Sequence, residues 1–99
     1  MTEFQTKVLL KTAEIPKGKV STYSDIAEAI GTNAVRAVGT VLRKNPCPPE
    51  IPCHRVVKSD GTLGMYSGEK TKKEMLEQEG IKISDDGKVT RFQEKRHRF

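Results

Sequence analysis

The stretch from Glu50 to Val57, EIPCHRVV, places a cysteine, a histidine and an arginine next to one another. A cysteine acts as a nucleophile through its thiolate, which a nearby base or positive charge favours. His54 could be that base for Cys53, and a histidine base needs an orienting partner. In an extended strand neighbouring side chains point to opposite faces, so the two would meet only through a bend or a bridging water. On these two residues alone, an inert buried cysteine beside a hydrogen-bonded histidine is the simpler interpretation.

The second cysteine, Cys47, is separated from Cys53 by five residues. This is not a usual zinc spacing, and the chain has no second cysteine pair to complete a site, so we expect no metal. A disulfide between the two is conceivable, but it is disfavoured inside a cell, where thiols stay reduced. We therefore expect two free thiols, of which at least one is a candidate for reactivity.

The length of 99 residues indicates one domain, with a net charge of +5 and a sequence pI of about 9.4. Such a surplus favours an anionic partner such as nucleic acid or a lipid surface, although a solvated lysine face gives the same composition. No apolar run has membrane-spanning length, and the first residues lack the features of a signal peptide. We expect a cytoplasmic protein without a membrane partner.

The first half of the chain is predicted to form three helices. Thr2 and Gln5 fit a capping box at the start of a helix that Pro16 ends. Thr22 and Asp25 fit a second capping box, which opens a short helix. Gly31 suits the left-handed position that stops a helix. The tight turn that follows leads to a third helix, so the pair predicts a helix-turn-helix, although a simple packing hairpin would have the same pattern.

Asn33 can cap this third helix, which is expected from Ala34 to about Lys44. Its small residues would let another helix or a DNA groove approach the backbone closely. These small residues are Ala34, Ala37, Gly39 and Thr40. Its basic residues, suited to phosphates, are Arg36, Arg43 and Lys44. Gly39 costs up to about 1 kcal/mol against alanine inside a helix, and a close approach would compensate for that cost.

The second half begins with a connector, NPCPPEIP, whose four prolines make it stiff and non-helical. CHRVV is then expected to be a short strand, and a helix is expected from about Glu69 to Glu79. The segment 81–99 alternates around Asp86-Gly87 and predicts a hairpin followed by a basic tail. That tail is either solvated or disordered, or an additional element that contacts phosphates.

Four stretches together, RAVGTVLRKNP, IPCHRVV, GMYSG and KKEMLEQEG, resemble the C-terminal domain of the 6-O-methylguanine-DNA methyltransferases. Members of this family repair alkylated guanine by taking the alkyl group onto their own cysteine. The resemblance covers roughly residues 1–80, with Pro-Cys-His-Arg and two valines as its most specific part. We expect an α/β domain that is mainly α, winged-helix-like, with a helix-turn-helix and a few short strands. Residues 1–80 would form the catalytic and DNA-binding domain and 81–99 a C-terminal extension.

The resemblance implies a catalytic group of five residues. Cys53 stands where the family has its alkyl acceptor, and His54 would be its water-linked base. Glu79 would orient the histidine. Asn45 matches a hinge asparagine between the recognition helix and the active-site loop. Tyr23 matches a tyrosine that helps to rotate the target nucleotide and meets the base.

The resemblance also implies a DNA surface and a pocket for the flipped base. Arg36 matches an arginine that fills the gap left in the duplex, and Tyr23 also belongs to this surface. The remaining DNA-binding residues would be Ala34, Ala37, Gly39, Thr40 and Arg43. The pocket would be formed by Tyr66, Ser67, Arg55, Val56 and Lys72. Lys73 is an alternative to Lys72, because the preceding loop is one residue shorter than in the family.

The implied activity is that of a single-turnover methylated-DNA–protein-cysteine S-methyltransferase that needs no metal or cofactor. Its partner would be double-stranded DNA containing alkylated guanine, and we expect a monomer. Most members carry an N-terminal domain ahead of this one, which we do not expect in this sequence, and we find no resemblance to the family in the segment from residue 81.

Three alternatives remain. Alkyltransferase-like proteins bind alkylated guanine without chemistry, but in them the signature cysteine is replaced, commonly by tryptophan or alanine. A winged-helix regulator would bind DNA by sequence, with an inert Cys53. A cysteine hydrolase would turn over small esters or peptides without DNA. The combination of Arg36 and Tyr23 with the thiol disfavours the last two.

Overall fold

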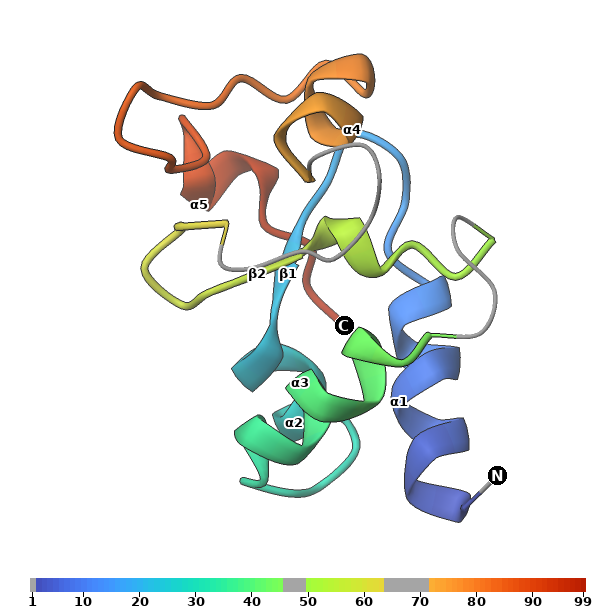
Figure 1. Cartoon of the computed structure of the whole chain (residues 1–99). Helices are drawn as coiled ribbons and strands as arrows, with labels where there is room; N and C mark the ends of the chain where they lie inside the picture. Colours follow the sequence, from blue (N-terminus) through green and yellow to red (C-terminus); the bar gives the residue numbers. More distant parts are fainter. Residues whose placement is uncertain (1, 46–49, 64–71) are drawn as a thin grey trace.

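The computed structural model describes residues 2–45, 50–63 and 72–99, and it is mainly helical around a small sheet, as expected. Figure 1 shows α1, α2 and α3 on one side of the two-stranded sheet, and α4 and α5 toward the other. No helix in the described ranges combines the length and apolar character needed to cross a membrane. The elements are α1 (Glu3–Ala13), β1 (Ser21–Thr22), α2 (Tyr23–Ala29), α3 (Val35–Arg43), the 3-10 helix η1 (Cys53–Arg55), β2 (Val56–Val57), α4 (Lys72–Gln78) and α5 (Phe92–Lys95).

The sheet joins β1 and β2 in parallel, with Ser21 opposite Val56 and Thr22 opposite Val57. The expectation that all of CHRVV is a strand was wrong, because its first three residues form η1. The Arg55 backbone N–H donates to the Pro52 carbonyl over 2.9 Å, so the chain turns as soon as it leaves the proline connector. Only the β-branched pair then adopts the extended form.

The helix-turn-helix of α2 and α3 is present, but its caps differ in part from those expected. Thr22 caps α2, accepting a 2.9 Å bond from the Asp25 backbone N–H. Gly31 stops α2 with a φ of +83°. The prediction that Asn33 caps α3 was wrong: Ala34 occupies the cap position without a side-chain bond. The Asn33 carbonyl instead accepts from the backbone N–H of Val35 over 2.9 Å.

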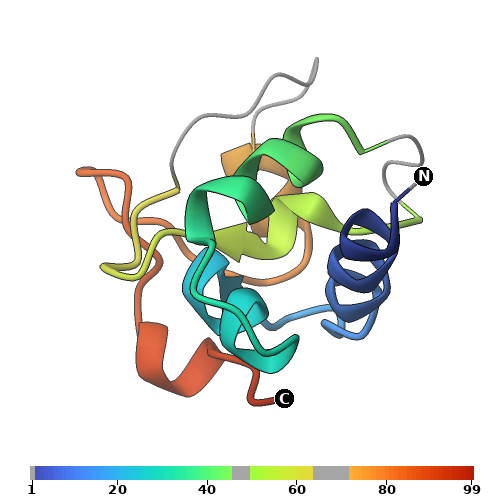
Figure 2. The ribbon, with the colours of Figure 1, turned by 90° about the horizontal axis from the view of Figure 1, so that it is seen from below.

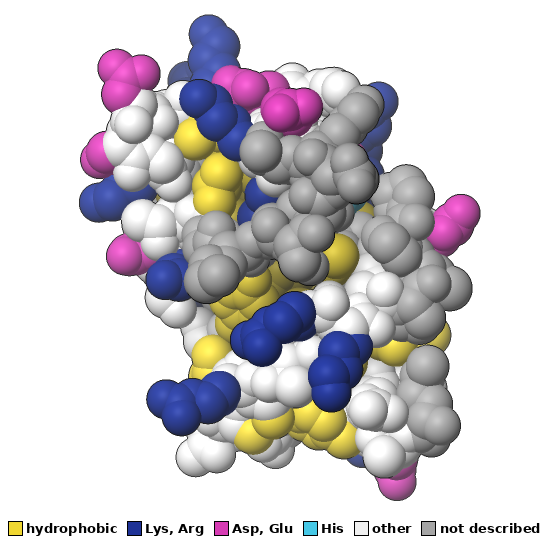
Figure 3. Space-filling model, viewed as in Figure 1, with side chains coloured by type: hydrophobic (Ala, Val, Ile, Leu, Met, Phe, Trp, Pro, Cys, Tyr) yellow, Lys and Arg dark blue, Asp and Glu magenta, His cyan; other side chains and the backbone are white. Residues whose placement is uncertain are grey.

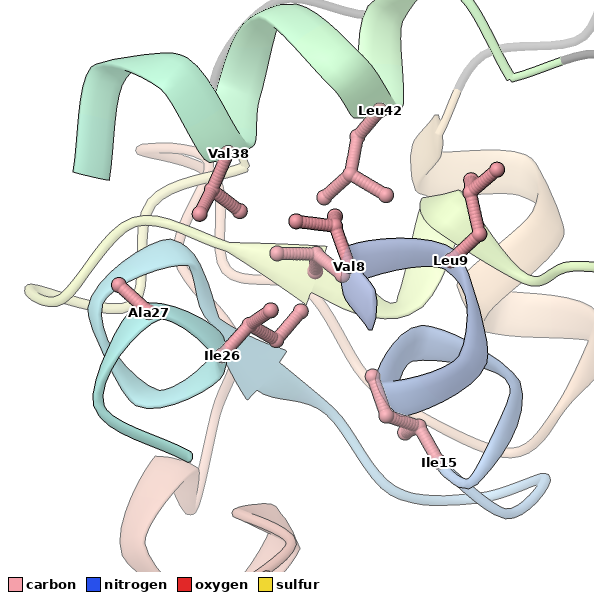
Figure 4. Packing of buried hydrophobic residues seen from close by; sticks show 8 residues of the cluster. Val8, Leu9, Ile15, Ile26, Ala27, Val38 and Leu42 are labelled. Atoms are coloured by element: carbon pink, nitrogen blue, oxygen red, sulfur yellow. The ribbon is translucent and has the colours of Figure 1, made fainter. Parts of the chain in front are cut away.

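Two hydrophobic clusters form the core, and β2 contributes to both. Figure 4 shows the first, in which side chains of α1, α2 and α3 point toward one another. The second lies beneath α4 and the C-terminal segment. Val56 belongs to the first cluster and Val57 to the second, because successive strand residues point to opposite faces. Because β2 packs against both clusters, the position of η1 directly before it is fixed as well.

The C-terminal segment is folded against the rest of the chain, so it is not the disordered tail that the sequence left open as one alternative. Ile81 and Val89 are buried in the second cluster. Ile83 pairs with Val89 around the Asp86-Gly87 turn, which confirms the predicted hairpin. From the last residue of α5 onward, residues 95–97 run beside the start of β1 (Figure 2), where Val20 bonds to the backbone of residues 95 and 97 over 2.9 and 2.7 Å.

Gly39 offers a test of how well α3 is packed within the protein. Among the described residues, a Cβ at this position would meet only the Tyr23 ring, at 3.9 Å, which is an ordinary contact. Gly39→Ala should therefore stabilise the fold by up to about 1 kcal/mol, through helix propensity. Gly31→Ala is the matched control: it also has space, but its positive φ should make it destabilising by about 1–2 kcal/mol. Chemical denaturation measures both, and a destabilising Gly39→Ala would show that α3 is packed more tightly than described.

Candidate functional site

A carboxylate that two side chains share lies at the centre of the site. His54 is 3% exposed, and its Nε2 lies 2.9 Å from Oε2 of Glu79, just after α4. Arg55 donates to both Glu79 oxygens, from Nε over 2.8 Å and from Nη2 over 2.7 Å. Its Nη1 donates to the Ile15 carbonyl over 2.8 Å. The predicted His54–Glu79 contact is thus confirmed, and Arg55 completes it.

This network fixes the charge on Glu79 and the tautomer of His54. Burial acts to raise the pKa of Glu79, but the hydrogen bonds from Arg55 and His54 outweigh burial, and the pKa lies below its usual value. A carboxylate only accepts hydrogen bonds, so Nε2 of His54 carries the shared proton. In the neutral ring Nδ1 then holds the lone pair, which makes it the basic nitrogen. An open depression beside the pair is lined by Lys17, His54, Arg55, Met75, Gln78 and Glu79.

Lys72 and Tyr23 form a second polar pair near Cys53. The Lys72 ammonium is buried and donates to the Tyr23 hydroxyl over 3.2 Å and to the Leu63 carbonyl over 3.0 Å. Burial lowers the pKa of Lys72 to about 8, against an opposing effect of Cys53. Burial also raises the pKa of Tyr23, and Cys53 adds to this increase. Both groups therefore lie close enough to respond to the charge on Cys53.

The two lysines considered from the sequence, Lys72 and Lys73, differ in burial. Lys72 is 3% exposed and contacts Tyr23, whereas Lys73 is exposed. Lys72 stays our prediction for the lysine at the pocket edge, and its ammonium lies against the Tyr23 hydroxyl.

Asn45 connects the end of α3 to the residues that precede Cys53. Its backbone N–H donates to the Leu42 carbonyl over 3.1 Å, so it continues the last turn of the helix. Its side-chain Nδ2 donates to the Ile51 carbonyl over 2.7 Å. The Cys53 backbone N–H binds that same carbonyl over 2.9 Å. The Ile51 carbonyl therefore connects α3 with Cys53, so a movement of α3 would also move Cys53. A hinge residue would make a connection of this kind.

The outer face of α3 is basic and has few large side chains. Figure 3 shows Lys and Arg side chains across the face over α3, whereas Asp and Glu side chains lie toward the edges of the view. Arg36, Ala37, Thr40 and Arg43 are exposed, and Ala34 and Gly39 are half-buried. A Cβ at Gly39 would contact the Tyr23 ring, so Tyr23 lies behind this part of α3.

The structure changes the interpretation of two expected pocket residues. The Val56 side chain is fully buried in the first cluster and is not accessible from the surface. The Arg55 guanidinium is occupied by Glu79 and the Ile15 carbonyl, and it acts on the pair rather than on a base. Tyr66, Ser67 and Cys47 lie outside the described residues. Within residues 2–45, 50–63 and 72–99, no three His, Cys, Asp or Glu side chains gather as a candidate metal site.

The buried Lys72 generates a prediction about stability and pH. The unfolded chain keeps the Lys72 proton to higher pH than the folded chain, whose Lys72 has a pKa of about 8. Above pH 8 the unfolded state therefore binds more protons, and raising the pH favours folding. The free energy of unfolding of the wild type should rise relative to Lys72→Met between pH 8 and about 9.5, below the titration of Tyr23. Urea denaturation along this range measures the difference, and parallel curves would contradict the burial of a charged lysine.

Comparisons with known proteins identify the relatives of this chain. Residues 3–81 match the family model of the 6-O-methylguanine DNA methyltransferase DNA-binding domain. The chain is 46% identical over 83 residues to the methylated-DNA–protein-cysteine methyltransferase of Methanothermobacter thermautotrophicus, covering 83% of this chain and 47% of that protein. The protein of the same name from Saccharolobus solfataricus is 46% identical over 82 residues, covering 83% of this chain and 54% of the relative. The chain spans about half the length of these relatives.

Solved structures add a second kind of relative. S. pombe Atl1 in complex with DNA containing O6-carboxymethylguanine has a TM-score of 0.85 and 35% identity, covering 100% of this chain and 98% of Atl1. Mycobacterium tuberculosis OGT in complex with DNA has a TM-score of 0.75 and 40% identity, covering 80% of this chain and 50% of OGT. By its match over residues 3–81 and its identity to named members, the chain belongs to the 6-O-methylguanine DNA methyltransferase family, through its DNA-binding domain.

Proposed function

We propose that this protein repairs DNA by moving the alkyl group of a 6-O-alkylguanine from the exocyclic oxygen to Sγ of Cys53. The observation that carries the proposal is the position of Cys53, directly before the buried His54–Glu79 pair and near enough to the bonded Tyr23 and Lys72 to affect the pKa of each. A nucleophile, a base with an orienting group, and a donor for the leaving oxygen are the parts this reaction needs. The activity named in the curated relatives supports the same reaction.

DNA would be bound through the basic outer face of α3. Its small exposed side chains allow the helix backbone to approach the minor groove, where sequence information is poor. This suits a protein that must find damage in any sequence. The solved DNA complexes of Atl1 and OGT support DNA as the partner.

The damaged base must leave the stack before the thiol can reach it. Flipping costs a few kcal/mol and is cheapest for a damaged, badly paired base. A side chain inserted into the stack would compensate for part of this cost, and we assign that role to Arg36, which is exposed on α3. Tyr23, behind α3, would meet the rotating nucleotide.

The transfer is a single substitution at the alkyl carbon. Nδ1 of His54 takes the Cys53 proton through a water, while the Glu79 carboxylate stabilises the resulting imidazolium. The sulfur–carbon bond forms as the carbon–oxygen bond breaks, and the electron pair of that bond stays with the guanine. The guanine gains a proton or hydrogen bond from Tyr23, whose hydroxyl accepts one from Lys72. The thioether is stable, so each molecule repairs one lesion.

A second candidate is a protein that recognises the lesion without transferring the alkyl group. The near-complete mutual coverage with S. pombe Atl1 favours it. The cysteine at position 53 favours transfer, because alkyltransferase-like proteins carry another residue at that place.

Intact-protein mass spectrometry distinguishes these two functions. After incubation with a duplex carrying one 6-O-methylguanine, the protein should gain one methyl group, mapped to Cys53. Cys53→Ser and an unmodified duplex are the controls, and both should give no gain. No gain in the wild type, with the lesion duplex still bound more tightly than unmodified DNA, would identify a recognition protein. No gain and no preference would leave only general DNA binding.

Binding to unmodified duplex should weaken steeply with salt, because phosphate contacts release counterions. Arg43 on the α3 face is exposed and suited to one such contact. Arg43→Gln should reduce the slope of log K against log salt by about one, whereas Arg43→Lys keeps the charge and should keep the slope. Fluorescence anisotropy between about 50 and 200 mM salt measures this slope. An affinity that does not change over this range would argue against electrostatic binding by α3.

A further inference from the structure

The C-terminal segment is bound directly to the start of α2. The backbone of residues 95–97 pairs with Val20, just ahead of β1. Arg96, in the middle of this pairing, forms a bidentate ion pair with Asp25, from Nε to Oδ2 over 2.7 Å and from Nη2 to Oδ1 over 2.6 Å. Both side chains are largely buried, with exposures of 19% and 16%. A bidentate pair fixes the orientation as well as the distance of its partners.

Arg96 is itself held in place by the segment around it. Its guanidinium lies 5.5 Å from the centre of the Phe92 ring, a cation–π contact with a residue of α5. Phe92 in turn packs against Gly61, which follows β2. The arginine therefore connects the second cluster, on which α5 packs, with the first turn of α2.

That first turn carries Tyr23. Tyr23 and Asp25 are the first and third residues of α2, and Thr22 caps the same turn. The hydroxyl of Tyr23 must reach Lys72 while its ring remains behind Gly39. A helical turn moves as a unit. The ion pair that fixes Asp25 therefore also fixes the orientation of this turn and the direction of the Tyr23 side chain.

We propose that Arg96 is a positioning residue of the lesion site, which sets the orientation of Tyr23 through its ion pair with Asp25. The inference rests on the proposed function, in which Tyr23 meets the flipped base. It extends the site to a segment outside the family match, which ends at residue 81. The segment 92–97 is thus part of the assembly that receives the damaged base.

The experiment compares Arg96→Gln, Arg96→Lys and Asp25→Asn with Arg91→Gln. Arg91 is the matched control, because its ion pair with Glu94 lies in the same segment but is 72% and 64% exposed. The first readout is the rate constant of methyl transfer at saturating lesion duplex, at a temperature where every variant is folded. Arg96→Gln should lower this rate by about tenfold, since small misplacements in a site have effects of this order or larger. Affinity for unmodified duplex should not change, and Arg91→Gln should behave as the wild type.

The second readout needs no activity. The chain has two tyrosines, so in a Tyr66→Phe background the tyrosine ring signals in an NMR spectrum belong to Tyr23 alone. Arg96→Gln should shift or broaden these signals, and Arg91→Gln should leave them unchanged. If Arg96 only stabilises the fold, its loss will lower the melting temperature while the ring signals and the transfer rate stay as in the wild type. That result would overturn the proposal.

The role of Arg96 can still be tested if Arg96→Gln does not fold or if the wild type is inactive. If Arg96→Gln does not fold, Arg96→Lys and the exchanged pair Asp25→Arg with Arg96→Asp replace it. The exchanged pair should recover the Tyr23 signals relative to Asp25→Arg alone, and failure to recover them would count against the ion pair. If the wild type transfers no methyl group, the proposed function fails, but the Tyr23 signals and the preference for lesion over unmodified duplex still test the role of Arg96.

Discussion

The structure depends above all on the carboxylate of Glu79. A largely buried charge is stable only when its oxygens are fully paired, and Arg55 and His54 together provide that pairing. The same arginine also binds the Ile15 carbonyl, so the segment after α1, the turn η1 and the end of α4 meet at one group. This arrangement gives the histidine a fixed ring orientation before any substrate arrives. For the proposed alkyl transfer, a site of this kind would need little reorganisation.

The small sheet gives that network its mechanical support. Two parallel residue pairs contribute little by themselves, but they lie between the two clusters, and their side chains contribute to both. The Cys53-containing turn is thus attached to a strand that cannot move toward either cluster without disturbing the packing of the other. The hinge contact of Asn45 with Ile51 attaches the same turn to α3. The Ile51 carbonyl, which accepts from both Asn45 and the Cys53 backbone, thus connects α3 with the turn that carries the thiol.

Much of the site could be predicted from the sequence, and the exceptions have a common physical cause. Caps and turns depend on neighbouring residues, which is why Thr2, Thr22, Gly31 and the Asp86-Gly87 turn were recognised correctly. The family motif supplied the pairing of His54 with Glu79. What was missed involves partners far apart in the chain: Arg55 with Glu79, and Arg96 with Asp25. No local pattern marks such pairs, because their residues become neighbours only after the clusters have formed. The prediction of an Asn33 cap was wrong for a different reason. The Asn33 carbonyl, and not its side chain, accepts the hydrogen bond from the first backbone N–H of α3.

The packing of the C-terminal segment has a practical consequence for protein engineering. A designer who trimmed the chain at residue 81, where the family match ends, would uncover Val20, Val57 and Leu76 and leave the Asp25 carboxylate without its arginine. The product would be expected to aggregate, because freshly exposed apolar surface favours association between molecules. Purification tags and fusion partners are for the same reason better joined ahead of α1, whose first turn is exposed and self-capped, than after Phe99, whose ring contacts His97 and Lys11. The smallest unit that can be handled as an independent module is thus set by the packing of the last helix rather than by the extent of the shared sequence.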